Sequence, residues 1–181
     1  MTNSLSYSGV VTLIKKVAGK TLSRTFYNNG TNRLFEAYAR AISGQNIDKF
    51  IPQYVRVYET YSQEHNGEIV EVKEERTRNP IPIVINYMSD NDSEANFDVP
   101  YARISVVILK NMIDLPTNLN SEHWATLELY SSSVGGDATK LAAVTVDDLL
   151  ESVKEMTGGA QILIQWDLCI LNATEGGLDN E

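Results

Sequence analysis

From Tyr54 to Leu171, short runs of β-branched and aromatic residues alternate with stretches rich in turn-forming residues. This spacing is typical of antiparallel strands that are joined by short loops. The runs are Tyr54–Tyr61, Glu68–Glu75, Ile81–Met88, Tyr101–Met112, Trp124–Ser131, Leu141–Val146 and Gln161–Leu171. We therefore predict a mainly β protein, built as an antiparallel β-sandwich or jelly roll.

The N-terminal part of the chain predicts a hairpin followed by a helix. Ser8–Val17 and Thr21–Tyr27 have strand character and flank a short connection that contains a glycine. After them, Asn29 and Gly30 tolerate left-handed backbone angles, and Thr31 can cap the first free N–H groups of a helix. We expect a turn at this point that leads into a helix.

The predicted helix spans about residues 32–43 and packs against the sheets. It is followed by Gly44, a typical helix end. Its apolar residues have helical spacing and form one broad stripe: Leu34, Phe35, Ala37, Tyr38, Ala41 and Ile42. A short second helix is expected at about residues 147–156, because Asp147 and Asp148 suit a helix N-terminus and helically spaced apolar residues follow.

Three of the later runs predict the position of their strands in a sheet. Glu68–Glu75 is polar enough to be an edge strand. Ile104–Leu109 and Ile162–Ile164 are nearly continuous aliphatic runs, which indicates central strands covered on both faces. In the last run we expect an outward face of Gln161, Gln165 and Asp167 and a core face of Ile162, Ile164, Trp166, Leu168 and Ile170.

The length of 181 residues fits one domain, which we place at residues 1–172. Residues 173–181 are acidic and rich in glycine, so we expect a flexible tail. The formal net charge of −9 opposes binding to nucleic acid or to an anionic membrane surface. We therefore predict neither partner.

The single cysteine, Cys169, lies in an apolar alternating run and cannot form an intramolecular disulfide. It reads as a small core residue of a protein that folds in a reducing cytoplasm. We expect no secretory signal, because the first eight residues lack a basic region and an apolar segment. No run of residues approaches the length of a membrane helix.

The residue types that carry common chemistry are few and scattered. His65, His123 and Cys169 do not have zinc-ligand spacing, and both histidines read as ordinary surface or turn residues. The loop with Asp90, Asp92 and Glu94 lacks the glycine and terminal glutamate of a calcium loop. No nucleophile elbow is present, and the glycine pairs 135–136 and 158–159 match no phosphate-binding motif. We predict no enzyme activity and no catalytic, metal or cofactor site.

Aromatic residues leave an alternative open. The nine tyrosines and two tryptophans could provide a recognition surface, because such side chains are favoured at interfaces and on sugar-binding platforms. A carbohydrate- or receptor-binding module on the same β-sandwich is therefore the second functional hypothesis. It requires an exposed aromatic platform near polar loops such as Ser89–Asn96.

Several motifs at the two ends of the chain resemble small β-rich virion structural proteins of tailed bacteriophages, including crAss-like phages. At the N-terminus these are YSGVVTL at residues 7–13, YNNGTNRLF at 27–35 and AISG at 41–44. In the second half they are WATLELYS at residues 124–131, LAAVTV at 141–146 and ILIQW at 162–166. Residues 63–120 do not take part in the resemblance.

The resemblance implies a structural turn-helix motif made of Asn29, Gly30, Thr31, Leu34 and Phe35. It also implies a non-enzymatic virion subunit of the capsid exterior, collar or tail. Such a subunit would be a multi-copy oligomer whose partners are other virion proteins and copies of itself. It would be synthesised in the cytoplasm of the host bacterium and would need no cofactor.

Overall fold

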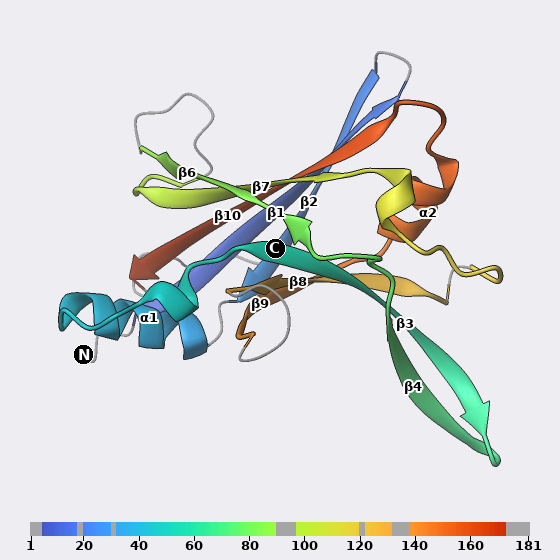
Figure 1. Ribbon diagram of the computed structural model, residues 1–181, viewed down its shortest axis with the longest axis horizontal. Helices are drawn as coiled ribbons and strands as arrows, with labels where there is room; N and C mark the ends of the chain where they lie inside the picture. Colours follow the sequence, from blue (N-terminus) through green and yellow to red (C-terminus); the bar gives the residue numbers. More distant parts are fainter. Residues whose placement is uncertain are drawn as a thin grey trace, which may run out of the picture.

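The computed structural model describes residues 5–17, 20–29, 32–89, 97–119, 122–131 and 138–172. These residues form a mainly β structure with two antiparallel sheets and two α-helices (Figure 1). Within these ranges, no helix has both the length and the apolar character needed to cross a bilayer.

Sheet A joins the two ends of the chain. The strand β10 pairs with β1 on one side and with β7 on the other. Its strands, in spatial order, are β2 (Lys20–Asn29), β1 (Leu5–Val17), β10 (Gln161–Asn172), β7 (Tyr101–Ile108) and β6 (Val84–Met88). The predicted N-terminal hairpin is present, since β1 and β2 pair from Ser8 with Asn29 to Val17 with Lys20.

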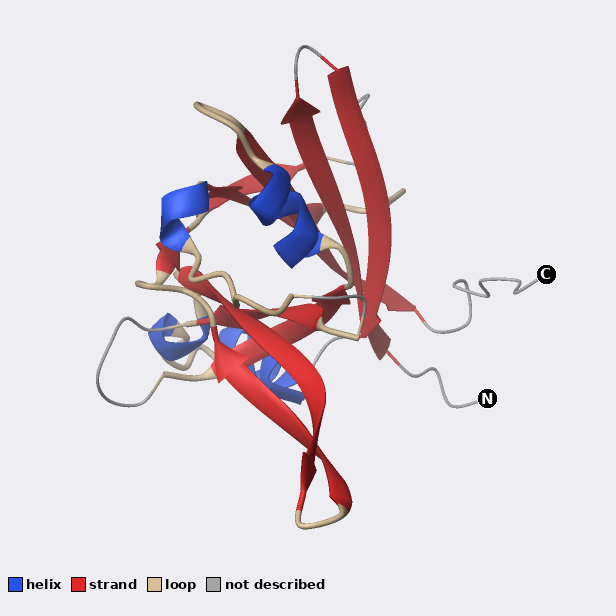
Figure 2. Cartoon of the chain, turned by 90° about the vertical axis from the view of Figure 1, so that its right-hand side faces the viewer, coloured by secondary structure: helices blue, strands red, loops and turns tan. Residues whose placement is uncertain are grey.

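Sheet B contains the predicted edge strand at one side. Its strands, in spatial order, are β4 (Glu68–Glu75), β3 (Tyr54–His65), β8 (Trp124–Tyr130) and β9 (Lys140–Val146), and the short β5 (Ile81–Pro82) also pairs with β3. The hairpin of β3 and β4 extends away from the rest of the molecule, as Figures 1 and 2 both show.

One core is shared by the two sheets and the helix α2 (Leu149–Glu155). Its fully buried strand members alternate along β3, β7, β8 and β10, as expected when one face of a sheet is covered. The fully buried core residues include Val55, Val57, Leu127, Leu129, Val106, Ile108, Ile162, Ile164, Trp166, Leu149 and Val153. The predicted core face of the last strand is confirmed for its first four residues. The side chain of Ile170 is outside the described residues.

The predicted strand Ile81–Met88 is divided between the two sheets. Its first two residues pair with β3 in sheet B, and Val84–Met88 pairs with β7 in sheet A. Pro82 explains the break, because proline has no N–H group to continue a ladder. The chain therefore crosses from one sheet to the other at Ile83.

The predicted strand Tyr101–Met112 ends early. The strand β7 stops at Ile108, and Lys110–Met112 forms the 3₁₀ turn η2. In this turn, Lys110 Nζ donates to the main-chain oxygens of Lys154 at 2.8 Å and Met156 at 2.9 Å. The lysine thereby satisfies carbonyl groups at the C-terminal end of α2 that have no partner within a helix.

The central position of β7 and β10 is confirmed, but the prediction that both of their faces are covered is wrong for β7. Val107 and Leu109 are exposed, whereas Ile104, Val106 and Ile108 are buried. The run is aliphatic on both faces although only one face packs on the core.

The first helix, α1 (Asn32–Ile42), matches its prediction in position, and its predicted apolar stripe is buried only in part among the described side chains. Gly44 has a φ of +68°, and Gln45 N donates to Arg40 O at 2.9 Å, which is the expected glycine-ended helix. However, Tyr38, Ala41 and Ile42 are exposed, and Ala37 is the residue that packs against the core. Three members of the predicted stripe are therefore not buried, whereas Ala37 is partly buried, and the side chains of Leu34 and Phe35 lie outside the described residues.

Candidate functional site

The predicted turn-helix motif joins β2 to α1. Asn29 is the last residue of β2, and Leu34 and Phe35 lie in the first turns of α1. Gly30 and Thr31 fall outside the described residues, as do the acidic loop with Asp90, Asp92 and Glu94, the glycine pair 135–136 and the tail 173–181. Their predicted roles stay predictions.

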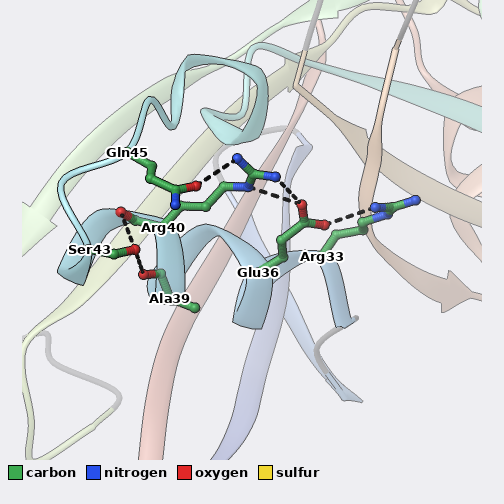
Figure 3. A network of polar contacts seen from close by, with 6 residues as sticks. All are labelled: Arg33, Glu36, Ala39, Arg40, Ser43 and Gln45. Atoms are coloured by element: carbon green, nitrogen blue, oxygen red, sulfur yellow. Dashed lines mark hydrogen bonds and ion pairs between the residues drawn. The ribbon is translucent and has the colours of Figure 1, made fainter.

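A chain of polar contacts runs along the surface of α1 (Figure 3). Glu36 accepts from Arg33 Nη1 at 2.9 Å and from Arg40 Nε at 3.0 Å, and Arg40 also donates to Gln45 at 3.1 Å. The hydrogen bonds from Arg33 and Arg40 lower the pKa of Glu36. These contacts hold the ionic side of α1 in place and leave Ile42, which is 69% exposed, at its C-terminal end.

The outer face of sheet B carries three tyrosines that contact one another. The rings of Tyr54 and Tyr130 stack with centroids 5.3 Å apart and planes 8° apart, and the hydroxyl groups of Tyr58 and Tyr130 lie 3.3 Å apart. Arg56 lies over the rings of both Tyr54 and Tyr130. Since Tyr54 is buried and the other two are half-buried, this cluster is not an open aromatic platform.

Glu128 lies in the centre of the same face and is nearly enclosed. It accepts hydrogen bonds from Lys73 at 2.5 Å, Tyr130 at 2.5 Å and Lys140 at 3.0 Å. Burial acts to raise the pKa of this carboxyl group, but the three hydrogen bonds outweigh it and lower the pKa. Burial and the hydrogen bond to Glu128 raise the pKa of Tyr130.

A second polar cluster is buried at the end of sheet B. The carboxylate of Glu59 is fully buried, and it accepts from Nδ1 of His123 and from the guanidinium of Arg76. The ring of Tyr61 stacks on His123 at 4.9 Å. Both histidines were expected to be ordinary surface or turn residues. His65 is exposed at the end of β3, whereas His123 lies in the loop before β8 with a side chain that is only 6% exposed.

A pocket of about 490 Å³ adjoins His123. Its other described lining residues are Trp124, Thr145, Asp147, Asp148 and Glu151. A histidine held by a buried carboxylate has the arrangement of a general base. However, the described lining contains no serine, cysteine or lysine, and its three carboxylates oppose the build-up of negative charge on a substrate.

Asp147 and Asp148 lie where they were predicted, directly before α2. Asp148 occupies the N-cap position of this helix, although its side chain makes no capping hydrogen bond there. Across the described ranges, no three or more His, Cys, Asp or Glu residues form a group that could hold a metal ion.

Cys169 is buried, as predicted. Burial raises the pKa of its thiol to about 12, and the neighbouring charge of Asp167 acts in the same direction. At neutral pH the thiolate that nucleophilic chemistry requires is therefore scarce.

Apolar side chains are exposed at two places on the edges of the sheets. At the far end of the β3–β4 hairpin, Ile69 is 81% exposed. On β6, at the edge of sheet A, Val84 is 61%, Ile85 is 42% and Tyr87 is 76% exposed. Neighbouring apolar groups in solvent, such as those on β6, can mark a surface that meets another molecule, whereas single exposed apolar residues are common on monomers.

A pocket of about 420 Å³ lies beside β6. In the register of sheet A, Ala102 stands between Tyr87 on β6 and Leu168 on β10, and all three line the pocket. The small side chain of Ala102 leaves space between two larger neighbours.

Comparisons with models of protein families, with curated proteins and with solved structures find no match to this chain.

Two features of these surfaces and clusters were not predicted from the sequence. Val55, Val57 and Glu59 are alternate residues of β3, and all three are buried. The alternation of the strand could therefore have indicated that Glu59 faces the core. The exposed edge formed by β6 required knowledge of the break at Pro82, because an unbroken strand would have belonged to one sheet only.

Proposed function

We propose that the protein is a non-enzymatic structural subunit of a tailed-phage virion, located on the capsid exterior, the collar or the tail. It acts through contacts with other virion proteins and with copies of itself. The motif resemblance at the two ends of the chain suggests the particle, and the exposed apolar residues support an assembly role.

The observation that carries the proposal is the hairpin formed by β3 and β4, which we call the arm. The first half of β3 lies in the core, whereas Ser62–His65 and Glu68–Glu71 are exposed. Ile69 is therefore held in solvent by strands that are anchored elsewhere in the fold. An extended hairpin with an apolar group near its end is suited to reach and contact a neighbouring subunit.

The two sheets around one core also support a more specific fold. We propose an antiparallel β-sandwich, with the jelly roll as the alternative connection scheme. In either case the arm leaves the body at the edge of sheet B, where β4 pairs only with β3 among the described strands.

Two measurements on purified virus particles test the proposal. The chain should be present in multiple copies per particle, and amide hydrogen exchange in the arm should be slower in the particle than in the free subunit. Absence of the chain from the particles, or equal exchange in both states, would refute the assembly role.

Variants of the arm sharpen the test. Ile69→Lys should reduce incorporation of the subunit into particles, because it places a charge where an apolar contact is expected. Ser62→Lys adds the same charge at an exposed polar position of the arm and should leave incorporation unchanged. Equal incorporation of both variants would show that Ile69 makes no assembly contact.

One observation favours the alternative, a carbohydrate- or receptor-binding module. Tyr87 is the most exposed aromatic residue among the described side chains, and it lines the pocket beside β6. Binding to a glycan array that is lost in Tyr87→Ala would support this function. Absence of binding by the native protein would count against it.

A further inference from the structure

The strand β6 has features that distinguish it from β4, an end strand of sheet B. It is the last strand of sheet A on its side, and among the described strands only β7 pairs with it in that sheet. Its five residues, Val84–Met88, carry no charge, and the first four are exposed. Edge strands of monomers normally carry charges or are covered, because free N–H and C=O groups invite pairing.

The strand β4 shows the protection that β6 lacks. Four of its eight residues are glutamates and one is a lysine. If β4 paired with itself in antiparallel fashion about its centre, Glu68 would lie opposite Glu75, which is unfavourable. Charges therefore oppose self-pairing at β4, whereas the side chains of β6 offer no electrostatic barrier to it.

We propose that β6 pairs in antiparallel fashion with β6 of a second copy of this chain, about a two-fold axis at Asn86. In this register Asn86 lies opposite itself. An amide side chain is both a donor and an acceptor, so two copies can hydrogen-bond to each other. Like-charged side chains could not do so.

The same register joins apolar residues on both faces of the new strand pair. Val84 lies opposite Met88 of the second copy, and Ile85 lies opposite Tyr87 of the second copy. Such β-branched and aromatic pairs stabilise antiparallel strands. The pairing would also cover Val84 and Tyr87, the most exposed apolar residues among the described side chains of sheet A.

The core of each copy continues into this interface. Trp166, Ile104 and Ile85 are neighbours in one row across sheet A, and the first two are buried while Ile85 is 42% exposed. A second strand would extend this row by placing the ring of Tyr87 from the other copy beside Ile85. The exposed end of the row is thereby covered, next to the pocket at Ala102.

This inference concerns contacts between two copies in solution and does not depend on a virion. The arm and β6 are separate surfaces, so the particle experiments on Ile69 and the solution experiments on Asn86 can fail independently.

A charge-complementation experiment tests the pairing. Light scattering and sedimentation over a range of concentrations should show a dimer for the native protein. Asn86→Asp and Asn86→Lys should each raise the dimer dissociation constant by about tenfold, because each places like charges opposite each other and removes an amide pair. An equimolar mixture of the two variants should restore dimers, since opposite charges then meet.

The control variants are Asn111→Asp and Asn111→Lys, which make the same charge changes at an exposed asparagine of η2. They should leave the dimer unchanged, and far-ultraviolet circular dichroism should show that all variants fold. A native protein that stays monomeric, variants of Asn86 that dimerise as the native protein does, or a mixture that fails to restore dimers would overturn the proposal.

Cross-linking gives an independent measurement. Paired Cα atoms in antiparallel strands lie about 4.5–5.5 Å apart, within the usual range for a disulfide. Asn86→Cys should therefore form a covalent dimer under mild oxidation, whereas Asn111→Cys should not. The native Cys169 gives little background, because it is buried. Equal cross-linking of both variants, or of neither, would contradict the two-fold pairing at Asn86.

Discussion

Glu128 shows how a single carboxylate can hold one face of a sheet together. It lies on β8 and binds Lys73 of β4, Lys140 of β9 and Tyr130 of its own strand. Because its side chain is nearly buried, these hydrogen bonds replace water that the carboxylate would otherwise bind. The three strands β4, β8 and β9 are therefore linked through one residue.

This arrangement predicts a pH-dependent contribution to stability. The pKa of Glu128 is lower in the folded state than in the unfolded chain, where it is about 4.3. The contribution is thus complete above that pH and is lost as the pH falls through the folded-state value. Glu128→Gln should reduce the free energy of unfolding by about 1–2 kcal/mol at pH 7, and the difference should narrow in acid.

Urea titrations of the native protein and the variant at several pH values measure this effect. Glu71→Gln, at an exposed position of β4, provides the control and should follow the native pH profile. The two proteins could instead differ in the free energy of unfolding by the same amount at neutral and acidic pH. That result would contradict a lowered pKa of Glu128 in the folded state.

Arg103 and Asp167 form a buried ion pair on the outer face of sheet A. Arg103 Nε donates to Asp167 Oδ1 and Nη2 donates to Oδ2, both at 2.8 Å, and Nη2 also donates to the hydroxyl of Tyr101 at 3.0 Å. Asp167 lies on the face opposite Trp166, as alternation predicted. The expectation that it is exposed is wrong, because the carboxylate is fully buried.

Removal of one partner of this pair should be costly. Asp167→Asn leaves the charge of Arg103 buried without its counter-charge, so we expect a loss of about 3 kcal/mol in the free energy of unfolding. The double variant Arg103→Met with Asp167→Leu should recover much of that loss. Asp98→Asn, at an exposed position, should have almost no effect in the same chemical denaturation experiment.

At the scale of single residues, strand alternation predicted which face a side chain occupies but not whether that face is covered. Asp167 and His123 are polar residues that the fold buries with partners distant in sequence: Arg103 lies 64 positions from Asp167, and Glu59 lies 64 positions from His123. Such partners follow from strand order, which a local pattern does not contain.

The β3–β4 hairpin depends on its turn. Asn66 and Gly67 both have positive φ, at 54° and 84°, and they connect the paired residues His65 and Glu68. Two positive φ values define the turn that matches the twist of a hairpin with a two-residue loop, and glycine adopts them without a steric penalty.

Gly67→Ala should therefore destabilise the arm by about 1 kcal/mol and speed amide exchange in β4. Gly158→Ala is the matched control: a methyl group there meets no atom within 4 Å, and Gly158 is not among the described glycines with positive φ. It should leave exchange in β4 unchanged. Equal rates in the two variants would contradict the role of the turn.

At the scale of elements, the sequence predicted most strands and both helices in place. The observed elements differ from the predicted ones at single residues that contact parts of the chain distant in sequence. The predicted strand ends before Lys110, which donates to carbonyl groups at the end of α2, and Pro82 divides a run between two sheets. The helix α1 lies where its period predicted, but periodicity alone did not show that Tyr38, Ala41 and Ile42 are exposed.

The whole molecule has one core to which both sheets and α2 contribute. Because disruption of either sheet exposes the same cluster, we expect the described body to unfold in a single cooperative transition. Tryptophan fluorescence, which reports on the buried Trp166 of sheet A and the half-buried Trp124 of sheet B, and far-ultraviolet circular dichroism should give coincident urea curves. Two separated transitions would show that the sheets are independent units.

Strand spacing was sufficient to predict the mainly β class but not the pairing of strands. Sheet A brings β1 beside β10, which are separated by almost the whole chain, and β2 lies close to β9 of sheet B. Pairings of this kind are governed by the closure of long loops and by burial over the entire fold. The candidate assembly surfaces depend on the same pairings. The polar sequence of Glu68–Glu75 indicated an edge strand, whereas the edge position of β6 follows only from the order of strands in sheet A.

The arm has a consequence for how this protein can change over generations. Val55 and Val57 are fixed by the core at one end of β3, whereas the exposed end of the hairpin has no packing role in the body. Substitutions near the tip can accumulate without loss of the fold, as long as the Asn66–Gly67 turn is kept. A lineage that must match a changing neighbour could therefore adjust this one segment and inherit the rest unaltered.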